Sequence, residues 1–530
     1  MSMNIKDMSL DQKIGQMLMI GFHSKKFDNH IKEMLYEHYI GNVILFSRNI
    51  GSKDEIIELT EDIQKNAMEV LGIPALISID QEGGMVTRIS NGATFLPGNM
   101  AIAATNDPKN AYIIGKIMGK ELGALGINMN LAPVLDVNNN PLNPVIGVRS
   151  YGEDPKNVAE FGTNYIRALQ EQGVVATAKH FPGHGDTKID SHVDLPLVLH
   201  SMDRLEEIEL YPFKAAIDSG VEAIMTAHII FKALEHQGRP ATLSHNIITG
   251  LLRNRLGFNG IVITDCMEMR AIAKYFGTAN AAVMAVKAGA DMILVSHTRE
   301  KQIDAARAIK QAVLKGDIPI ENIDMSVQRI LSIKRKYSIG DYSFNGAKGL
   351  NDILGNRDHI EKAKEVSLES VTVVKDDKCL LPIKTKNILV ISPEPVLMTG
   401  VEDCNTEMDS FAQALTDELG GIYSIMDINP DGDYIKNISV KAKDKELIVV
   451  GTYNANLNEG QVKLINELYK CNQNIIVVAL RNPYDISKFK EIPTYICTYE
   501  YTPLSIASLI RVLAGYKMSL GRAPVTIEER

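Results

Sequence analysis

Short apolar runs alternate with amphipathic helical patterns through the first 340 residues of the chain. Several runs, such as VILF, IVIT and MILV, are almost wholly apolar, which is typical of strands covered on both faces of a parallel sheet. The eight strand candidates are 17–21, 42–46, 75–79, 127–131, 174–178, 222–226, 261–264 and 291–295. Eight strand-then-helix units predict a (β/α)8 barrel of the TIM type. An open doubly wound sheet is the alternative, but no glycine-rich phosphate loop follows the first strand.

The helical patterns between the strands carry helix end signals. Segment 52–71 opens with Ser52 and an acidic first turn, and it stops before Gly72. Several of the other candidates close on glycine, as helix C-termini do; they are 107–126, 154–173, 201–220 and 246–256.

A second α/β region follows a break in the periodicity. Residues 337–356 are rich in Gly, Asn, Asp and Ser, which indicates a linker. Beyond it, strands are expected near 371–375, 387–391, 446–451, 474–479 and 495–498, with helices near 359–369, 409–419, 458–470 and 504–513. We therefore predict a catalytic barrel (1–338), a linker (339–360) and a smaller C-terminal α/β sandwich domain (361–530).

The composition excludes two classes of partner. The net charge is −9 and the pI is near 5.8, whereas a general nucleic-acid binder needs a basic surface. No run of 18 apolar residues occurs, so neither a membrane span nor a membrane partner is expected. The five cysteines form no C-x-x-C pair, and residues 1–22 lack the pattern of an export signal. We therefore expect reduced thiols and a cytoplasmic protein.

Polar residues follow six of the eight apolar runs, where the strands of a barrel would end. Chemistry in this fold takes place at the C-terminal ends of the strands. A single aspartate there is often only a helix cap, but so regular a placement predicts an active site at the barrel mouth. The residues concerned are Asp80, Asn130, Asp136, Arg149, Lys179, His180, His228, Asp265, Ser296 and His297.

Segment 179–196 (KHFPGHGDTKIDSHVDLP) holds the densest cluster of ionisable residues. One interpretation is a metal-dependent hydrolase whose ligands are His180, His184, Asp186 and His192. The other is metal-free acid/base catalysis by Asp190 and His192, which lie on the same side of an extended segment. A carboxylate beside an imidazole fixes the tautomer of the ring and raises its proton affinity. The pattern alone leaves both interpretations open.

A carboxylate also follows the seventh strand candidate. Asp265 comes directly after IVIT, and a carboxylate with apolar neighbours at a barrel mouth can act as a nucleophile or as an electrostatic stabiliser. Glu268 is the rival carboxylate, although its position also suits a helix start.

Several motifs together carry a family resemblance. They are KIGQMLMIGF (13–22), NVILFSRNI (42–50), ISIDQEGGMVTRI (77–89), NLAPVLDVNNNPLNPVIGVRSYGEDP (130–155), KHFPGHGDTKIDSHVDLP (179–196), IMTAHI (224–229), VITDCMEM (262–269), SVTVVKDDKCLLPI (370–383) and GRAPVTI (521–527). With these motifs the sequence resembles glycoside hydrolase family 3 enzymes of the β-N-acetylglucosaminidase branch. The resemblance covers nearly the whole chain, and the KHFPGHGDT…DSH string is its most specific part.

The resemblance implies a retaining, two-step mechanism. Asp265 matches the nucleophile that forms a glycosyl-enzyme, and His192 with Asp190 matches a histidine-based acid/base on a mobile loop. A histidine in this role is unusual, because most retaining glycosidases use two carboxylates. The residues that match the sugar-binding pocket of the family are Asp80, Arg88, Arg149, Lys179, His180 and His228.

The implied substrate is terminal β-linked N-acetylglucosamine, often on peptidoglycan fragments where it is joined to N-acetylmuramic acid. No cofactor and no metal are expected. An N-acetylglucosaminide phosphorylase on the same fold is the alternative, because a histidine repels an incoming phosphate less than a carboxylate does. Two features depart from the pattern: Met85 stands where relatives often carry arginine, and the chain has no tryptophan, so any sugar stacking must use Tyr or Phe.

Overall fold

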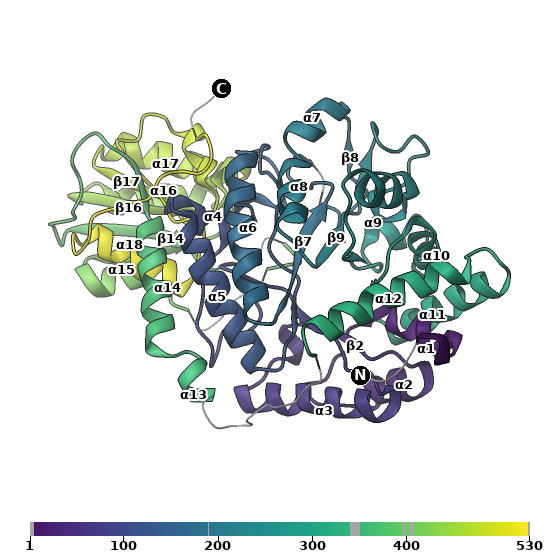
Figure 1. The fold of residues 1–530 in the computed structure, drawn as a ribbon. Coiled ribbons are helices and arrows are strands. Elements are labelled where there is room, and N and C mark those ends of the chain that lie inside the picture. Colours follow the sequence, from purple (N-terminus) through teal and green to yellow (C-terminus); the bar gives the residue numbers. More distant parts are fainter. Residues whose placement is uncertain (1–4, 189, 340–349, 396–398, 403–407, 528–530) are drawn as a thin grey trace.

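The computed structural model describes residues 5–188, 190–339, 350–395, 399–402 and 408–527. Eight parallel strands form a sheet in the order β11-β9-β7-β6-β3-β2-β1-β12 (Figure 1). A parallel bridge between Ile263 and Met292 joins its two ends, so the sheet curls into a barrel. The strands are β1 (Leu18–Ile20), β2 (Asn42–Leu45), β3 (Ile77–Ile79), β6 (Met129–Asn130), β7 (Val175–Phe181), β9 (Ala223–Thr226), β11 (Ile261–Thr264) and β12 (Ile293–Val295). The predicted TIM-type barrel is confirmed, and each strand candidate overlaps an observed strand.

Local sequence signals explain where the barrel helices begin and end. In α3 (Lys53–Leu71) the Ser52 hydroxyl accepts the N–H of Glu55, and the Glu55 carboxylate accepts the N–H of Ser52. The helix ends at Gly72, whose φ of 62° is left-handed. The other helices of this region are α1 (Leu10–Gln16), α2 (Asn29–His38), α4 (Asn99–Ala104), α5 (Pro108–Ala124), α6 (Pro155–Glu171), α9 (Arg270–Ala273), α10 (Thr278–Ala288), α11 (Arg299–Leu314) and α12 (Ile320–Lys336).

Two of the predicted barrel helices differ from the expectation. Segment 201–220 contains two helices, α7 (Met202–Glu207) and α8 (Tyr211–Asp218). Pro212 lies in the first turn of α8, where its missing N–H costs no hydrogen bond, but proline cannot continue α7. The helix predicted at 246–256 is the π-helix η5 (Asn246–Arg255). Two small sheets, β4 (Gln81–Gly83) with β5 (Val86–Thr87) and β8 (Leu197–Val198) with β10 (Ile230–Phe231), lie outside the barrel sheet.

The C-terminal part is a three-layer α/β sandwich with its own sheet, in the order β13-β18-β17-β16-β14-β15. Only β13 is antiparallel to its neighbour. Helices α16 and α17 pack on one face, and α15 and α18 pack on the other. The elements are β13 (Thr372–Asp376), β14 (Ile388–Pro393), α15 (Phe411–Leu419), β15 (Ile422–Met426), α16 (Gly432–Ala442), β16 (Leu447–Thr452), α17 (Glu459–Cys471), β17 (Ile475–Ala479), β18 (Thr494–Cys497) and α18 (Pro503–Leu513).

Sequence analysis misses β15 and α16 in this sandwich. β15 is an edge strand whose Ile422 and Tyr423 face solvent, so it lacks the burial pattern of the inner strands. α16 contains β-branched residues and asparagine, which are weak helix formers, and it is stabilised by an Asp431 cap and by packing of its apolar face. Tertiary contacts therefore determine both elements.

Helix α14 (Arg357–Ser370) joins the two parts of the molecule. Its residues pack against α4, α5 and α18, and Figure 1 shows it running beside α5. His359 Nδ1 lies 2.6 Å from Glu121 Oε1 of α5, which anchors the helix to the barrel. Short helix α13 (Leu350–Ile353) and the start of α14 fall within the predicted linker, and residues 340–349 of that linker lie outside the described residues. The domain limits stay a prediction.

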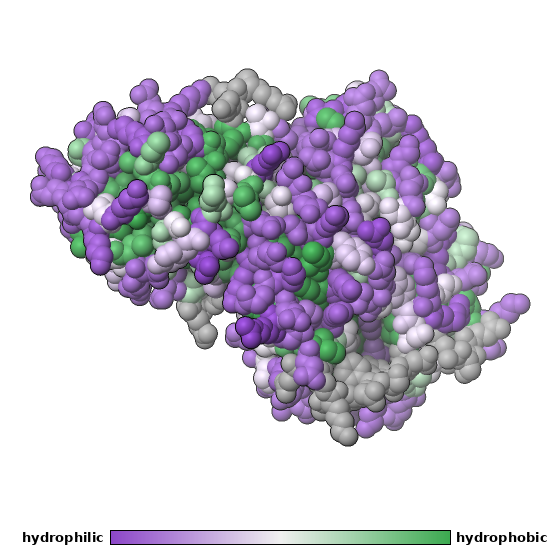
Figure 2. Space-filling view, turned by 60° about the vertical axis from the view of Figure 1, so that its left-hand side comes forward, coloured by the Kyte–Doolittle hydropathy of each residue, from purple (hydrophilic) through white to green (hydrophobic). Residues whose placement is uncertain are grey.

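Hydrophilic side chains cover much of the face shown in Figure 2, with hydrophobic side chains gathered mainly on its left-hand lobe. This mixture fits a chain in which 23% of the residues are charged and 45% are hydrophobic. Within the described ranges, none of the helices combines the length and the hydropathy needed to cross a membrane.

Candidate active site

A cavity of about 320 Å³ opens where the strands of the barrel end. Its walls come from β7, from segments that follow β2, β3, β6, β7, β11 and β12, and from one loop of the C-terminal sandwich. Ten residues singled out in the sequence line it: Asp80, Arg88, Arg149, Lys179, His180, His184, His192, Asp265, Ser296 and His297. The structure therefore brings residues from four distant motifs to one site.

Two cations share buried Glu82 on one wall of the cavity. Lys179 Nζ lies 2.7 Å from Asp80 Oδ1 and 2.8 Å from Glu82 Oε1. Arg149 donates Nε to Glu82 Oε2 at 2.9 Å and Nη2 to Oε1 at 2.7 Å. Burial raises the pKa of Glu82, but the charges of Arg149 and Lys179 outweigh it and hold that pKa well below its usual range. Glu82 and both cations remain charged, and Lys179 and Arg149 present hydrogen-bond donors in fixed positions to the cavity.

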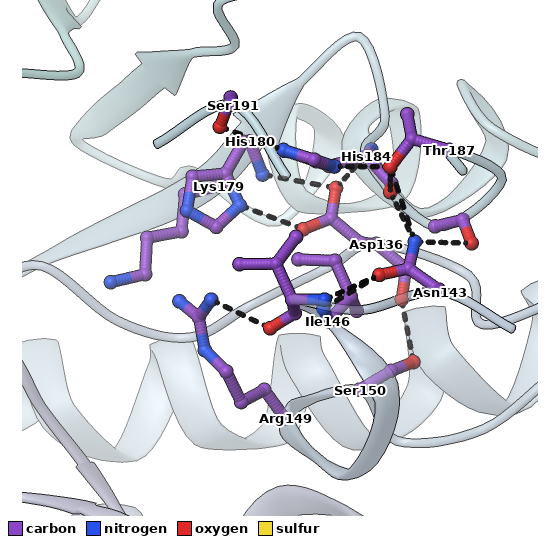
Figure 3. Close-up of polar contacts among 12 residues, drawn as sticks. Asp136, Asn143, Ile146, Arg149, Ser150, Lys179, His180, His184, Thr187 and Ser191 are labelled. Atoms are coloured by element: carbon purple, nitrogen blue, oxygen red, sulfur yellow. Dashed lines mark hydrogen bonds and ion pairs between the residues drawn. The ribbon is translucent and has the colours of Figure 1, made fainter. Parts of the chain in front are cut away.

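Buried Asp136 orients the histidines of the β7 end (Figure 3). Its Oδ2 lies 2.7 Å from His180 Nδ1, and its Oδ1 accepts the backbone N–H groups of His180 at 3.2 Å and His184 at 2.6 Å. Burial raises the pKa of Asp136, but the charges and hydrogen bonds of the two histidines bring it below its ordinary value. An ionised Asp136 places a proton on Nδ1 of His180 and leaves Nε2 for the cavity.

Asp190 and His192 form a hydrogen-bonded pair on the loop after β7. His192 Nδ1 lies 2.7 Å from Asp190 Oδ1, and the backbone N–H of His192 donates to the same oxygen at 2.8 Å. Burial lowers the pKa of His192, but the bond to Asp190 and the charges of Asp190 and Asp265 together raise it above its ordinary value. Asp190 is not part of the cavity wall and reaches the cavity only through His192.

Asp265 follows β11 on the cavity wall. Its Oδ1 accepts the backbone N–H of Cys266 at 2.6 Å. Burial raises the pKa of Asp265, but electrostatic interactions with the neighbouring His228, His180 and His192 lower it below its ordinary value. The carboxylate is therefore ionised, and it interacts electrostatically with His192 across the same cavity.

His228 and Glu268 lie behind the cavity wall. His228 is 1% exposed, and its Nε2 donates to the Cys266 carbonyl at 2.9 Å while its Nδ1 lies 2.8 Å from Thr242 Oγ1. Burial lowers the pKa of His228, so this ring is a neutral support for the backbone beside Asp265. Glu268 accepts the backbone N–H groups of His297 and Thr298 before α11. The structure gives Glu268 a helix-start role, and Asp265 is the carboxylate that faces the cavity.

The C-terminal sandwich completes one side of the cavity through residues 400–402. Arg88 Nη1 donates to the Val401 carbonyl at 2.7 Å. Arg481 Nε donates to Glu402 Oε1 at 3.0 Å in an ion pair that is almost wholly buried. Met85 does not line the cavity: its sulfur accepts the backbone N–H of Tyr501 at 3.3 Å, and it packs in the core of the sandwich. The methionine at position 85, where relatives often carry arginine, therefore affects the contact between the barrel and the sandwich.

Comparisons with known proteins agree with this geometry. Residues 9–333 match the family described as "Glycosyl hydrolase family 3 N terminal domain". The chain belongs to glycosyl hydrolase family 3. The expected family and the expectation of a glycoside hydrolase are thereby confirmed.

Individual relatives of this family 3 chain cover most of its length. "Beta-hexosaminidase A" of Pseudoalteromonas piscicida is 36% identical over 416 residues, which are 71% of this chain and 69% of that protein. The structure of a family 3 beta-N-acetylglucosaminidase from Paenibacillus sp. str. FPU-7 is 40% identical, with a TM-score of 0.92, and the match covers 98% of this chain and 99% of that one. A structure of the beta-glucoside phosphorylase BglX is 25% identical, with a TM-score of 0.83, over 99% of this chain and 94% of that one.

The four metal-ligand candidates of the family 3 loop do not converge. Their nearest polar partners are Asp136 for His180, Thr187 and Ser191 for His184, His200 for Asp186, and Asp190 for His192. Among the described residues, Glu33, Glu37 and His38 have ligand atoms close enough together to hold a metal ion. They lie elsewhere on the barrel. The cluster therefore does not form the metal site that one interpretation of the sequence required.

Several residues of the family 3 site are not assigned a role by sequence reasoning. Glu82 lies two residues after Asp80 in the same motif, so a count of acidic residues at the strand end would find it. Phe46 and Arg48 directly follow β2 and line the cavity, with the guanidinium 4.2 Å from the centre of the Phe46 ring. Val401, in the loop that also carries Glu402, is 313 residues from Arg88 along the chain, and no local signal connects them.

Proposed function

We propose that the protein is a retaining exo-β-N-acetylglucosaminidase that removes terminal β-linked N-acetylglucosamine through a covalent glycosyl-enzyme. The observation that carries this proposal is one cavity lined by both the Asp265 carboxylate and the His192 imidazole. The names of the relatives support the substrate class, since one is a β-hexosaminidase and another a β-N-acetylglucosaminidase.

In the first step, Asp265 attacks the anomeric carbon as the glycosidic C–O bond breaks. The ionised state of Asp265 suits a nucleophile. His192 gives its Nε2 proton to the departing oxygen, so the leaving group departs as an alcohol and the sugar becomes an ester of Asp265. The raised pKa of His192 favours the protonated ring that this step needs.

In the second step, water attacks the ester and His192 takes its proton. The charge of Asp265 contributes to the raised pKa of His192, and esterification removes that charge. The pKa of His192 therefore falls once the glycosyl-enzyme forms, which suits the change from acid to base. Two inversions at the anomeric carbon return the β-configuration.

Other polar residues of the same cavity orient the sugar. Asp80, Lys179, Arg149 and His180 offer hydrogen-bond donors and acceptors to its hydroxyls. The cavity volume of about 320 Å³ is near the lower limit of small-molecule sites, which is about 300 Å³. A cavity of this size fits one sugar residue, which suits an exo-acting enzyme.

Hydrolysis of a chromogenic N-acetyl-β-glucosaminide by wild type, Asp265→Asn and His192→Ala tests the mechanism. We expect Asp265→Asn to lose at least about 1000-fold in kcat, because the covalent route is closed. Trapping the wild type with a 2-deoxy-2-fluoro glycoside and locating the adduct by mass spectrometry identifies the nucleophile. An adduct on any residue other than Asp265 refutes the assignment.

We further propose peptidoglycan fragments that carry GlcNAc–MurNAc as the natural substrate, so muropeptides would be the physiological partners. Product analysis with this disaccharide is the test: release of free GlcNAc supports the proposal, and activity on chitobiose without activity on GlcNAc–MurNAc contradicts it.

A phosphorylase is the second candidate function. It is supported by the histidine acid/base and by the similar fold of a β-glucoside phosphorylase. In that reaction phosphate replaces water in the second step and yields sugar 1-phosphate. Formation of only free sugar at millimolar phosphate rejects this candidate.

A further inference from the structure

The loop that carries Asp190 and His192 is held by the barrel in two different ways. Its inner part is fixed by buried groups: His184 N–H donates to Asp136, and Asn143 Nδ2 donates to the carbonyls of His184 and Gly185 at 2.8 Å each (Figure 3). Gly185 approaches the Val137 carbonyl so closely that a Cβ would lie 1.7 Å from its oxygen. The inner part is therefore anchored to the barrel by buried contacts.

The outer part of the loop contacts the barrel at the surface, through Asp194 with Lys274 and Tyr275, and at a buried position through Ser191. This residue is 2% exposed, whereas Val193, two positions on, is 57% exposed. Ser191 Oγ lies 3.1 Å from His184 Nε2, and the Ser191 carbonyl accepts the N–H of Ala271 in α9 at 3.3 Å. Ser191 therefore connects the segment that bears the dyad to the fixed inner part of the loop.

The hydrogen-bond partners determine the direction of the His184–Ser191 bond. Burial lowers the pKa of His184 to about 4, so its ring is neutral. Thr187 donates its hydroxyl proton to the His184 carbonyl at 3.2 Å and accepts from His184 Nδ1 at 2.9 Å. Nε2 then has no proton and accepts the hydroxyl of Ser191.

We propose that His184 and Ser191 are positioning residues, which latch the outer loop so that Nε2 of His192 stays at the leaving-group oxygen. The inference rests on the proposed function, because it acts through His192 as general acid. A displacement of about 1 Å at such a group is enough to slow proton transfer strongly. Asp190 determines the tautomer and the proton affinity of His192, whereas the latch, which is the His184–Ser191 hydrogen bond, determines the position of the ring.

Ser191→Ala tests the latch with two substrates that differ in their need for an acid. Phenyl N-acetyl-β-glucosaminide has a poor leaving group that must be protonated, whereas the 2,4-dinitrophenyl analogue departs as a stable anion. We expect kcat/KM to fall about tenfold for the phenyl substrate and less than about threefold for the dinitrophenyl one, given the usual worth of one hydrogen bond. The dinitrophenyl rate also reports whether the variant is folded.

Ser244→Ala is the matched control, since it removes a buried serine hydroxyl that donates to Glu235 at 2.6 Å away from the loop. We expect it to change both substrates equally. His184→Leu should reproduce the Ser191→Ala pattern, and the double variant should be no worse than the more damaged single one, because both break the same bond. Equal losses for the two substrates in Ser191→Ala, or additive losses in the double variant, overturn the latch.

A failure of the proposed function gives a different result. His192→Ala must show a stronger leaving-group dependence than Ser191→Ala if His192 is the general acid. A wild-type-like ratio between the two substrates in His192→Ala refutes the function itself, whereas that ratio in Ser191→Ala alone refutes only the latch.

Discussion

Asp190→Asn removes the charge beside His192 and keeps the shape of the side chain. The amide oxygen can still accept the Nδ1 proton, which lies on a 2.7 Å contact in the wild type. A hydrogen bond to a charged group is worth about 1.5–3 kcal/mol, compared with about 1 kcal/mol for a neutral pair. The loss of the charge, about 0.5–2 kcal/mol by this difference, should therefore reduce kcat/KM for a phenyl glycoside about 2- to 30-fold at neutral pH.

The pH profile of this variant tests the electrostatic reason. Asp190 raises the pKa of His192, and the first step needs the protonated ring, so activity is lost as the pH rises through that pKa. Asp190→Asn lowers the pKa of His192, and the basic limb of kcat/KM should move to lower pH. The measurement is kcat/KM for the phenyl glycoside between pH 5 and 9.

Asp186→Asn is the matched control for this experiment. It removes the same charge four residues away, where Asp186 pairs with His200 at 2.6 Å and does not line the cavity. We expect its basic limb to coincide with that of the wild type. If Asp190→Asn leaves the limb in place, or if Asp186→Asn moves it equally, the local charge of Asp190 is not what raises the pKa of His192.

Three further predictions concern buried charged or ionisable residues, Glu82, Arg481 and Glu500. Glu82→Gln leaves two buried cations without their shared carboxylate, and we expect urea unfolding to show a loss of about 3–5 kcal/mol; a loss below about 1 kcal/mol contradicts the buried network. Arg481→Met removes the ion pair that Arg481 forms with Glu402 in the cavity loop. We expect KM for a chromogenic glucosaminide to rise about 3- to 10-fold with little change in kcat. An unchanged KM refutes the role of this loop in binding. Burial raises the pKa of Glu500 to about 7, so the folded state holds the proton of this carboxyl group and the free energy of unfolding falls as the pH rises from about 4 to 7. Glu500→Gln should therefore increase the free energy of unfolding by about 3 kcal/mol over the wild type at pH 8 and leave it unchanged at pH 4. An equal change at both pH values contradicts the pKa shift.

The barrel could be predicted because its strands have a local signature. A strand covered on both faces must be apolar throughout, and each of the eight runs is short enough to recognise. The same logic fails for β15, which is half exposed at a sheet edge, and for the break between α7 and α8. In those places packing and proline geometry outweigh the periodic pattern.

Much of the candidate site could be predicted for a related reason. In a parallel barrel all strands end at one rim, so Asp80, Lys179 and Asp265 are brought together once the fold is known. The assignment of roles depended on motif resemblance, and the roles of Asp265, His192 and Asp190 stay proposals. His228 differs from the expectation in position, because it supports the backbone behind Asp265 and does not face the cavity.

The barrel, the rim of polar residues and the spacing of the dyad follow from the amino-acid sequence alone, because apolar runs and short-range spacing are properties of neighbouring residues. Which charges share a partner depends on the folded chain. Glu82 meets Arg149 across 67 residues, and Arg88 meets Val401 across 313. Such pairs depend on distances through space. The pKa shifts at the site likewise come from charges and hydrogen bonds that only the folded chain brings together in a buried place, and no local pattern records them.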